Sequence, residues 1–154
     1  MRVRGKRALV PAVAGALLSS MLATGCASEQ ERYCDAVRES ASELKSLSRR
    51  ADRVPAASVL ASLPILADLA EKAPPELRDE WTTVLNALRT FEDALRDSGV
   101  DPGPGAADAV EALPPEDRDA VQQAAGRLVD PQVIEASLGI EDYGAQVCDE
   151  SLGL

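Results

Sequence analysis

Hydrophobic residues recur at intervals of three and four positions through most of the chain after residue 28, without the strict apolar–polar alternation typical of strands. This periodicity indicates amphipathic helices. The clearest run lies between Pro75 and Gly99, where spacings of four, three, four, three and four form a heptad seam. The seam residues are Leu77, Trp81, Val84, Leu88, Phe91 and Leu95. The sequence therefore predicts an all-α protein.

Two helices are expected before this seam. The first begins at Ser28, because Ser28 and Glu31, three residues later, have the spacing of a capping box. It ends before Pro55. The second covers residues 56–72 and contains Pro64, which lacks a backbone donor and predicts a kink or a break within the helix.

Proline and glycine divide the chain after the seam. Residues 99–105 hold three glycines and two prolines, a composition that predicts a loop. A short helix over 106–113 and two longer helices over 114–129 and 131–151 are expected to follow. In the two longer helices the positions expected to face the core are Val121, Ala124, Ala125, Leu128, Val129, Val133, Ile140, Tyr143 and Val147.

The first 25 residues differ from the rest in charge and hydropathy. They contain four basic residues, no acidic residue, and an apolar run over residues 8–18. This is the pattern of a secretory signal peptide, and the run is well short of the roughly 20 apolar residues that span a bilayer. We therefore expect residues 1–25 to be removed and residues 26–154 to form a single helical domain.

A short motif ends this first segment. The stretch Leu22-Ala23-Thr24-Gly25-Cys26 resembles the lipobox of bacterial lipoproteins. The resemblance implies cleavage before Cys26, a diacylglyceryl group with acyl chains such as palmitate on its thiol, and attachment to the outside of the cell membrane. The family usually has leucine where this chain has Ala23, and the same small residues also fit an ordinary secretory cleavage site. Plain secretion is therefore the alternative.

Charge bears on which partners the exported part can have. All 26 acidic residues but only 12 of the 16 basic ones fall in residues 26–154, which gives that part a net charge of −14. Nucleic acid and anionic lipid head groups repel such a body. We expect no nucleic-acid partner, and we expect the lipid on Cys26 to carry the membrane attachment, since two acyl chains anchor a protein stably.

The cysteines link the two ends of the exported part. There are three, Cys26, Cys34 and Cys148, and a Cys34–Cys148 disulfide would leave Cys26 for lipidation. The alternative interpretations of Cys34 and Cys148 are a pair of metal ligands or a catalytic thiol. The disulfide would bring both chain ends to one pole, which requires an even number of passes and favours a four-helix-like antiparallel bundle. Either 114–129 and 131–151 form one bent pass, or Pro64 splits the second helix.

Residues for catalysis or metal binding are scarce. The chain has no histidine and no recognisable nucleophile, phosphate-binding or zinc-binding motif. Two acidic groups at helix starts would suit a hard cation in principle, although both belong to faces expected to be solvated. They are Glu76, Asp79 and Glu80, and Glu116, Asp117 and Asp119. We expect neither a metal nor a cofactor.

These patterns together favour a non-enzymatic, lipid-anchored interaction module of the cell envelope. The exported part is similar to the many small uncharacterised helical lipoproteins of actinobacteria, which implies no particular activity. With only Ala27 between Cys26 and the cap at Ser28, the pole with the disulfide is expected near the membrane and the opposite pole outward. A carrier of a small apolar or cationic ligand is the alternative. A hydrolase would need buried paired carboxylates, and the sequence singles out none.

Overall fold

Six α-helices and one 3₁₀ turn make up the part of the chain that the computed structural model describes, namely residues 28–51, 53 and 55–154. No strand occurs among these residues, so the all-α prediction is confirmed. In chain order the elements are α1 (Glu29–Ala51), α2 (Pro55–Lys72), the 3₁₀ turn η1 (Pro75–Leu77), α3 (Arg78–Asp97), α4 (Ala106–Glu111), α5 (Pro115–Arg127) and α6 (Pro131–Val147).

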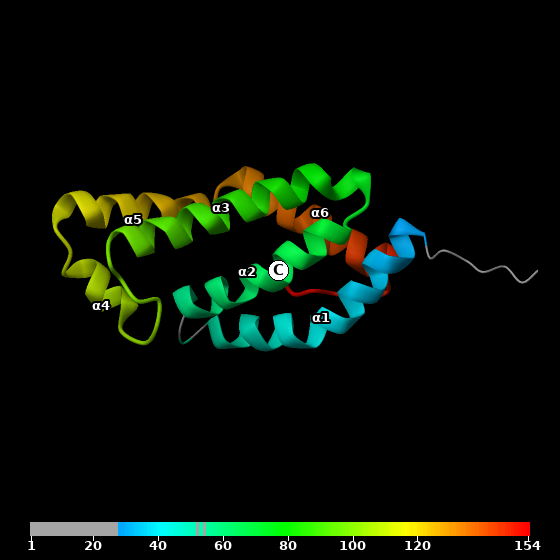
Figure 1. Ribbon diagram of the computed structural model, residues 1–154, viewed down its shortest axis with the longest axis horizontal. Helices are drawn as coiled ribbons and strands as arrows, with labels where there is room; N and C mark the ends of the chain where they lie inside the picture. Colours follow the sequence, from blue (N-terminus) through cyan, green and yellow to red (C-terminus); the bar gives the residue numbers. More distant parts are fainter. Residues whose placement is uncertain (1–27, 52, 54) are drawn as a thin grey trace, which may run out of the picture.

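The helices run back and forth as a four-pass antiparallel bundle (Figure 1). α1 and α2 form the first two passes, α3 is the third, and α5 followed by α6 is the fourth. α4 is a short connection beyond the end of α3. The fourth pass bends between its two helices, and both of them pack along α3. The two last helices therefore form one bent pass, and Pro64 does not split α2, which is one continuous helix.

Two prolines explain where the bend falls. Asp130, directly before Pro131, is extended, with φ −61° and ψ 141°, so α5 cannot continue into α6 through it. Pro64, in contrast, lies inside α2 with its side chain on the exposed face, while Leu66 and Leu69 of the same helix are buried. Packing of these leucines holds α2 together despite the lost backbone donor.

The beginning of α1 has the predicted capping box. The Ser28 N–H donates to Glu31 Oε2 at 2.7 Å, and the Glu31 N–H donates to Ser28 Oγ at 3.1 Å. Two backbone donors that no helical carbonyl can reach are satisfied in this way. The first helix therefore begins where the sequence predicted.

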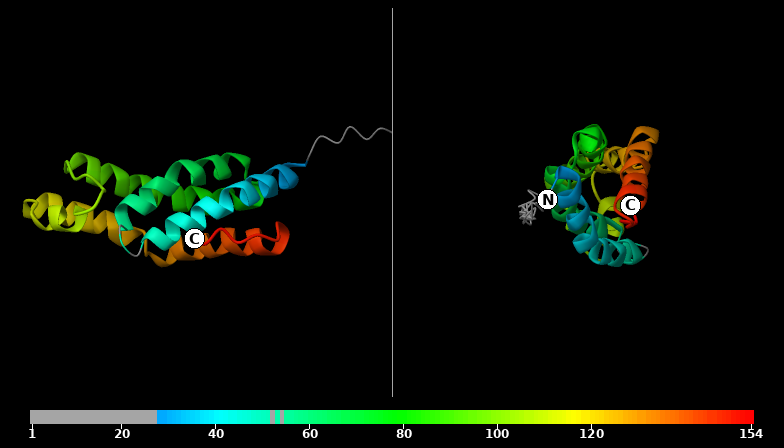
Figure 2. Two further views of the ribbon diagram at one scale, coloured as in Figure 1. Left: turned by 90° about the horizontal axis from the view of Figure 1, so that it is seen from below. Right: turned by 90° about the vertical axis from the view of Figure 1, so that its right-hand side faces the viewer.

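The Cys34–Cys148 disulfide is present and joins the second turn of α1 to the residue after α6. We call the end of the bundle that holds it the proximal pole. The opposite end, the distal pole, holds the end of α1, the start of α2, the 99–105 loop and α4, and α4 projects beyond the end of α1 (Figure 2). Both ends of the described chain segment meet the bundle in its proximal half, as the predicted pairing requires.

The buried residues form two clusters that the α3 seam connects. The proximal core is centred on Tyr33, Leu69, Trp81, Ile140 and Leu152, each at most 1% exposed. The distal core is much smaller and consists of Phe91, Leu95, Val100, Val121 and Ala124. All six predicted seam residues of η1 and α3 are buried, so this prediction is confirmed. The distal pole has few large side chains with which to fill its interior.

Two of the positions predicted to face the core are wrong. Val129 is 68% exposed, because it falls in the turn where α5 ends rather than on a helix face. Val147 is 37% exposed at the last residue of α6, where the chain reverses. The last helix was also expected to reach residue 151, whereas it ends at Val147.

The reason α6 ends early is that the chain folds back along it. Asp149 takes a left-handed conformation with φ 55°, and the Glu150 N–H donates to the Gly144 carbonyl at 3.0 Å. A Cβ at residue 144 would lie 2.8 Å from the Glu150 carbonyl oxygen, so the reversal requires glycine there. Residues 149–154 then run in the space between α1 and α6 (Figure 2).

Side chains on both neighbouring helices hold this returning segment. The Glu141 carboxylate of α6 accepts the N–H groups of Leu152 and Gly153, both at 3.1 Å, and also the Ser151 hydroxyl. Lys45 of α1 forms an ion pair with Glu150 at 2.5 Å. Leu152 itself is fully buried in the proximal core. The segment therefore fills the space between α1 and α6 and ties the two helices together.

Candidate functional site

The three cysteines predicted as modification sites have different outcomes. Cys34 and Cys148 are joined in the disulfide and are 4% and 1% exposed. Their burial makes this a structural crosslink and not an accessible redox pair. Cys26 lies outside the described residues, so its lipidation stays a prediction. Ser28, the first described residue, lies at the proximal pole, two residues along the chain from Cys26.

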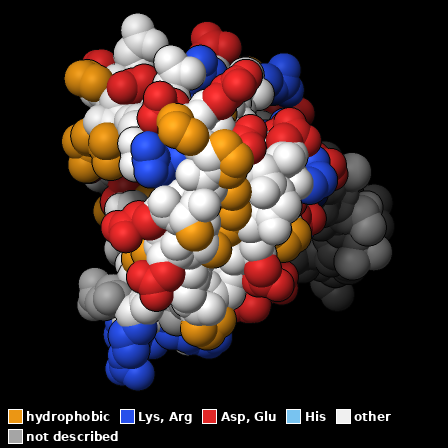
Figure 3. Space-filling model, turned by 90° about the vertical axis from the view of Figure 1, so that its left-hand side faces the viewer, with side chains coloured by type: hydrophobic (Ala, Val, Ile, Leu, Met, Phe, Trp, Pro, Cys, Tyr) orange, Lys and Arg blue, Asp and Glu red, His pale blue; other side chains and the backbone are white. Residues whose placement is uncertain are grey.

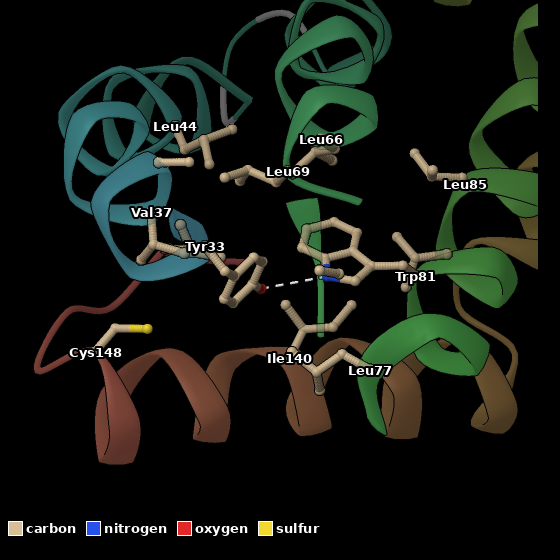
Figure 4. Packing of buried hydrophobic residues seen from close by; sticks show 14 of the residues in the cluster. Tyr33, Val37, Leu44, Leu66, Leu69, Leu77, Trp81, Leu85, Ile140 and Cys148 are labelled. Carbon is tan, nitrogen blue, oxygen red and sulfur yellow. Dashed lines mark hydrogen bonds between the residues drawn. The ribbon is translucent and has the colours of Figure 1, made fainter. Parts of the chain in front are cut away.

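Aromatic side chains pack beside the disulfide in a closed arrangement (Figure 4). The Trp81 indole N–H donates to the Tyr33 hydroxyl at 3.2 Å, and the Tyr33 ring meets Tyr143 edge-on at 5.8 Å between centroids. The Tyr143 hydroxyl donates to Glu76 Oε1 at 3.4 Å. These residues join α1, η1, α3 and α6. The buried aromatic rings fill the interior at this level of the bundle, and their role is packing.

Burial also governs the ionisation of these tyrosines. Desolvation raises the pKa of Tyr33 from its ordinary value of 10.0 to about 12, and the hydrogen bond from Trp81 offsets part of this effect. Burial, and then the charge and hydrogen bond of Glu76, raise the pKa of Tyr143 as well. Both groups stay protonated at neutral pH, so neither is a base.

The acidic groups at the helix starts do not converge on a metal site. Within the described part of the chain, no set of three or more acidic, cysteine or histidine side chains is arranged to hold an ion. Glu76 receives the Tyr143 hydroxyl instead. Glu80 Oε2 is buried without a hydrogen-bond partner, and its side chain lies against α6 where Gly139 leaves room, 3.5 Å from a Cβ built there.

An apolar groove opens at the distal pole among the described residues, and we call it the distal groove. It has a volume of about 380 Å³ and lies between the start of α2, the end of α3, α4 and α5. Phe91, Leu95 and Val121 form its buried floor. Its other lining residues are mostly small, and its polar ones are Arg53, Glu111 and Gln122. This volume is within the range of ligand sites in proteins.

The groove exists because short side chains surround it. Residues 99–105 turn with positive φ at Gly99 and Gly105, of 69° and 93°, which carries the chain away from α3 before α4 begins. α4 then presents Ala106, Ala107 and Val110 toward α5, and α5 presents Ala125. Such side chains are too short to fill the space between four elements. The distal groove therefore stays open to solvent above its floor.

Acidic side chains surround the distal groove. Residues 100–126 contain six acidic residues and one basic residue, Arg118, and all six acids are exposed. In Figure 3 apolar side chains form a band across this end of the molecule, with acidic side chains on both sides. Basic side chains gather at one corner of the same view. Arg53 lies on the α2 side of the groove and Glu111 on the α4 side.

Two other apolar features lie nearer the proximal half of the bundle. A second opening of about 260 Å³ lies among α1, α2, α3 and α6, next to the end of the returning segment at Gly153 and Leu154. On the outer face of α6, Ile134 and Leu138 are 47% and 59% exposed and are one turn apart. Neither feature has the acidic surround of the distal groove.

No described helix combines the length and the apolar character that a membrane crossing requires. No protein-family model matches the chain, and neither a curated protein nor a solved structure does. The site must therefore be judged on its own geometry. Sequence reasoning missed the distal groove. The available signal was the alanine-rich stretch over 106–125 directly after a glycine- and proline-rich loop, where little side-chain volume is present to form a core.

Proposed function

We propose that this chain is a lipid-anchored, non-enzymatic binding module of the bacterial cell envelope that presents the distal groove to a partner. The observation that carries the proposal is the position of this apolar groove at the end of the bundle opposite Ser28. The 23 residues of α1 span about 35 Å at 1.5 Å per residue. A lipid on Cys26 would thus hold the proximal pole at the membrane and direct the groove away from it.

The disulfide suits this arrangement. It ties the start of α1 to the end of α6, so a force on the anchored end of the chain is shared between two helices. The capping box fixes the first turn of α1 only two residues after Cys26. A short tether and a crosslinked base would present the distal pole in a defined direction, as a binding module requires.

The anchor and the groove are tested in the same cells. A Cys26→Ala variant is expected to leave the membrane fraction and to lose incorporation of labelled fatty acid, whereas plain secretion predicts no label in the natural chain. A photo-crosslinking amino acid at exposed Ala107, on the rim of the groove, is expected to capture a partner. The same amino acid at exposed Gln146, near the proximal pole, is the matched control. Equal capture at both positions, or none at Ala107, would contradict the proposal.

A small-ligand carrier is the second candidate, and the volume of the distal groove favours it. Its openness to solvent favours a partner surface instead, since carriers enclose most of their ligand. Native mass spectrometry of the chain extracted from its own membrane distinguishes the two. A carrier retains a bound molecule of constant mass, and an Ala107→Trp variant that fills the rim loses it.

A further inference from the structure

The charge and shape of the distal groove identify the chemistry of its occupant, and this step rests on the proposed function. We infer that the groove receives a basic amphipathic helix of a partner protein, with apolar side chains on the floor and basic side chains along α4 and α5. The inference is drawn from the lining of the groove, from the acids that surround it and from the charge of the whole body.

The floor of the groove accounts for the apolar face of the occupant. Phe91, Leu95 and Val121 are at most 7% exposed, yet they line the opening and are accessible from it. A helix laid across a groove inserts side chains spaced three and four residues apart, and a floor formed by α3 and α5 offers several such contacts in a row. A flat protein surface would leave this floor unfilled.

The surrounding acids account for the basic residues. Among the described residues, no salt bridge involves Asp108, Glu111, Glu116, Asp117 or Asp119, and the one base among them, Arg118, donates to the Glu111 carbonyl. Their charge is therefore not neutralised by a salt bridge within the described part of the chain. Opposite charge on a partner would speed its association and fix its orientation.

The extent of this charge favours a peptide segment over a single small cation. The acids occur along the chain from Asp101 to Asp119, over the 99–105 loop, α4 and the first turns of α5. A small ligand in the groove would touch Glu111 and leave most of the others unpaired. A second copy of this chain is excluded as the natural occupant by repulsion between two bodies of charge −14.

Basic residues near the α2 edge of the groove determine which way the charged side chains of the occupant must face. Arg49 and Arg50 end α1, and Arg53 lines the groove from the α2 side. The occupant must therefore place its own basic residues toward α4 and α5 and away from the end of α1. Consequently the two edges of the groove should respond differently to substitution.

The test uses the full chain in vesicles of zwitterionic lipid, with protein-free vesicles as background. The probe is a fluorescent peptide of about four helical turns, with leucine at positions i, i+3, i+4 and i+7 and lysine elsewhere, and its anisotropy is followed. A peptide with glutamate in place of lysine is the matched control probe. Five variants are compared with the natural chain. Ala107→Trp fills the rim, and Ala120→Trp lies at an exposed position outside the groove. The others are Glu111→Gln combined with Asp108→Asn, Arg53→Gln, and Leu138→Asp.

The natural chain is expected to bind the lysine peptide and not the glutamate peptide. Ala107→Trp should weaken binding at least tenfold and Ala120→Trp should leave it unchanged. Glu111→Gln with Asp108→Asn should weaken it several-fold and reduce its dependence on salt. Arg53→Gln should not weaken it. Binding that survives Ala107→Trp, or that Leu138→Asp on the outer face of α6 abolishes, would overturn the inference.

The crosslinking at Ala107 described above separates this inference from the proposed function. If the captured segment is a basic amphipathic helix, the inference is supported. If a partner is captured at Ala107 through a segment without that pattern, the inference fails and the proposed function stands. If nothing is captured at Ala107 and the lysine peptide does not bind, both fail.

Discussion

Replacing both disulfide cysteines, Cys34→Ala with Cys148→Ala, is expected to lower the free energy of unfolding by about 4 to 5 kcal/mol. The crosslink joins residues 114 positions apart, so it closes nearly the whole described chain into one loop. In the unfolded state this closure removes conformational freedom that grows with the logarithm of the loop length. The folded state loses little, because the two sulfur atoms lie within a packed core.

The size of the effect follows from the loop length. The chain-entropy relation gives about 4.7 kcal/mol at 25 °C for a loop of about 100 residues. Loss of two buried sulfur atoms at sites that are 4% and 1% exposed adds a smaller packing loss of the same sign. Small domains have a total stability of about 5 to 15 kcal/mol, so the double variant should be close to the limit of folding.

Urea denaturation followed by tryptophan fluorescence measures this loss. Trp81 is the single tryptophan of the chain, is 1% exposed, and lies in the proximal core, so its emission reports unfolding of the crosslinked region. Reducing the natural disulfide is the control, because it opens the loop without removing either sulfur. The reduced protein and the double variant should unfold at similar urea concentrations, both well below the oxidised protein.

Two outcomes would contradict this reasoning. A loss below about 1 kcal/mol in both reduced protein and double variant would mean that the unfolded chain is already compact, with its ends close together. A large loss in the double variant together with a small one on reduction would assign the effect to core packing rather than to loop closure.

Three further predictions concern the proximal half. Gly144→Ala should destabilise the protein by about 1 to 3 kcal/mol in the same denaturation assay, because its Cβ would meet the Glu150 carbonyl. Leu152→Ala should lower the free energy of unfolding by about 2 to 5 kcal/mol, whereas Val129→Ala, at an exposed valine, should lower it by less than about 0.5 kcal/mol. Between pH 10 and 12 the unfolded chain releases the Tyr33 proton while the folded chain keeps it, so stability should fall by roughly 2 to 3 kcal/mol across this window. Urea midpoints that stay constant over this pH range would refute the last prediction.

Local signals in the sequence were sufficient for most of the bundle. The capping box at Ser28 and Glu31 depends on two side chains three residues apart, and the α3 seam depends on a repeat along one helix. Such features are determined within a few turns of chain, so the pattern alone specifies them. The disulfide could be predicted from the cysteine count, because residues 26–154 offer only one pair if Cys26 is reserved for the predicted lipid.

Features that depend on two distant segments were not predictable in the same way. The expectation of helix to residue 151 failed because the chain instead turns back at Asp149 to bury Leu152 in the proximal core. Nothing in the six residues after Cys148 indicates that Glu141 of α6 would accept the backbone N–H groups of Leu152 and Gly153. The periodicity of α6 places Val147 inward, and only this reversal explains its exposure.

The distal groove exists because the side chains around it are small. The lack of side-chain volume explains why the groove was missed and why it suits binding. A periodic pattern marks where apolar residues face the core, but it does not measure whether Ala106, Ala107 and Ala125 fill the space that they face. The disulfide, the tyrosines and the returning segment all stabilise the proximal pole, whereas the distal core contains only five buried residues. Helices with few buried contacts open at low free-energy cost. The crosslinked half can thus preserve the fold while α4 and α5 adjust to an occupant of the groove.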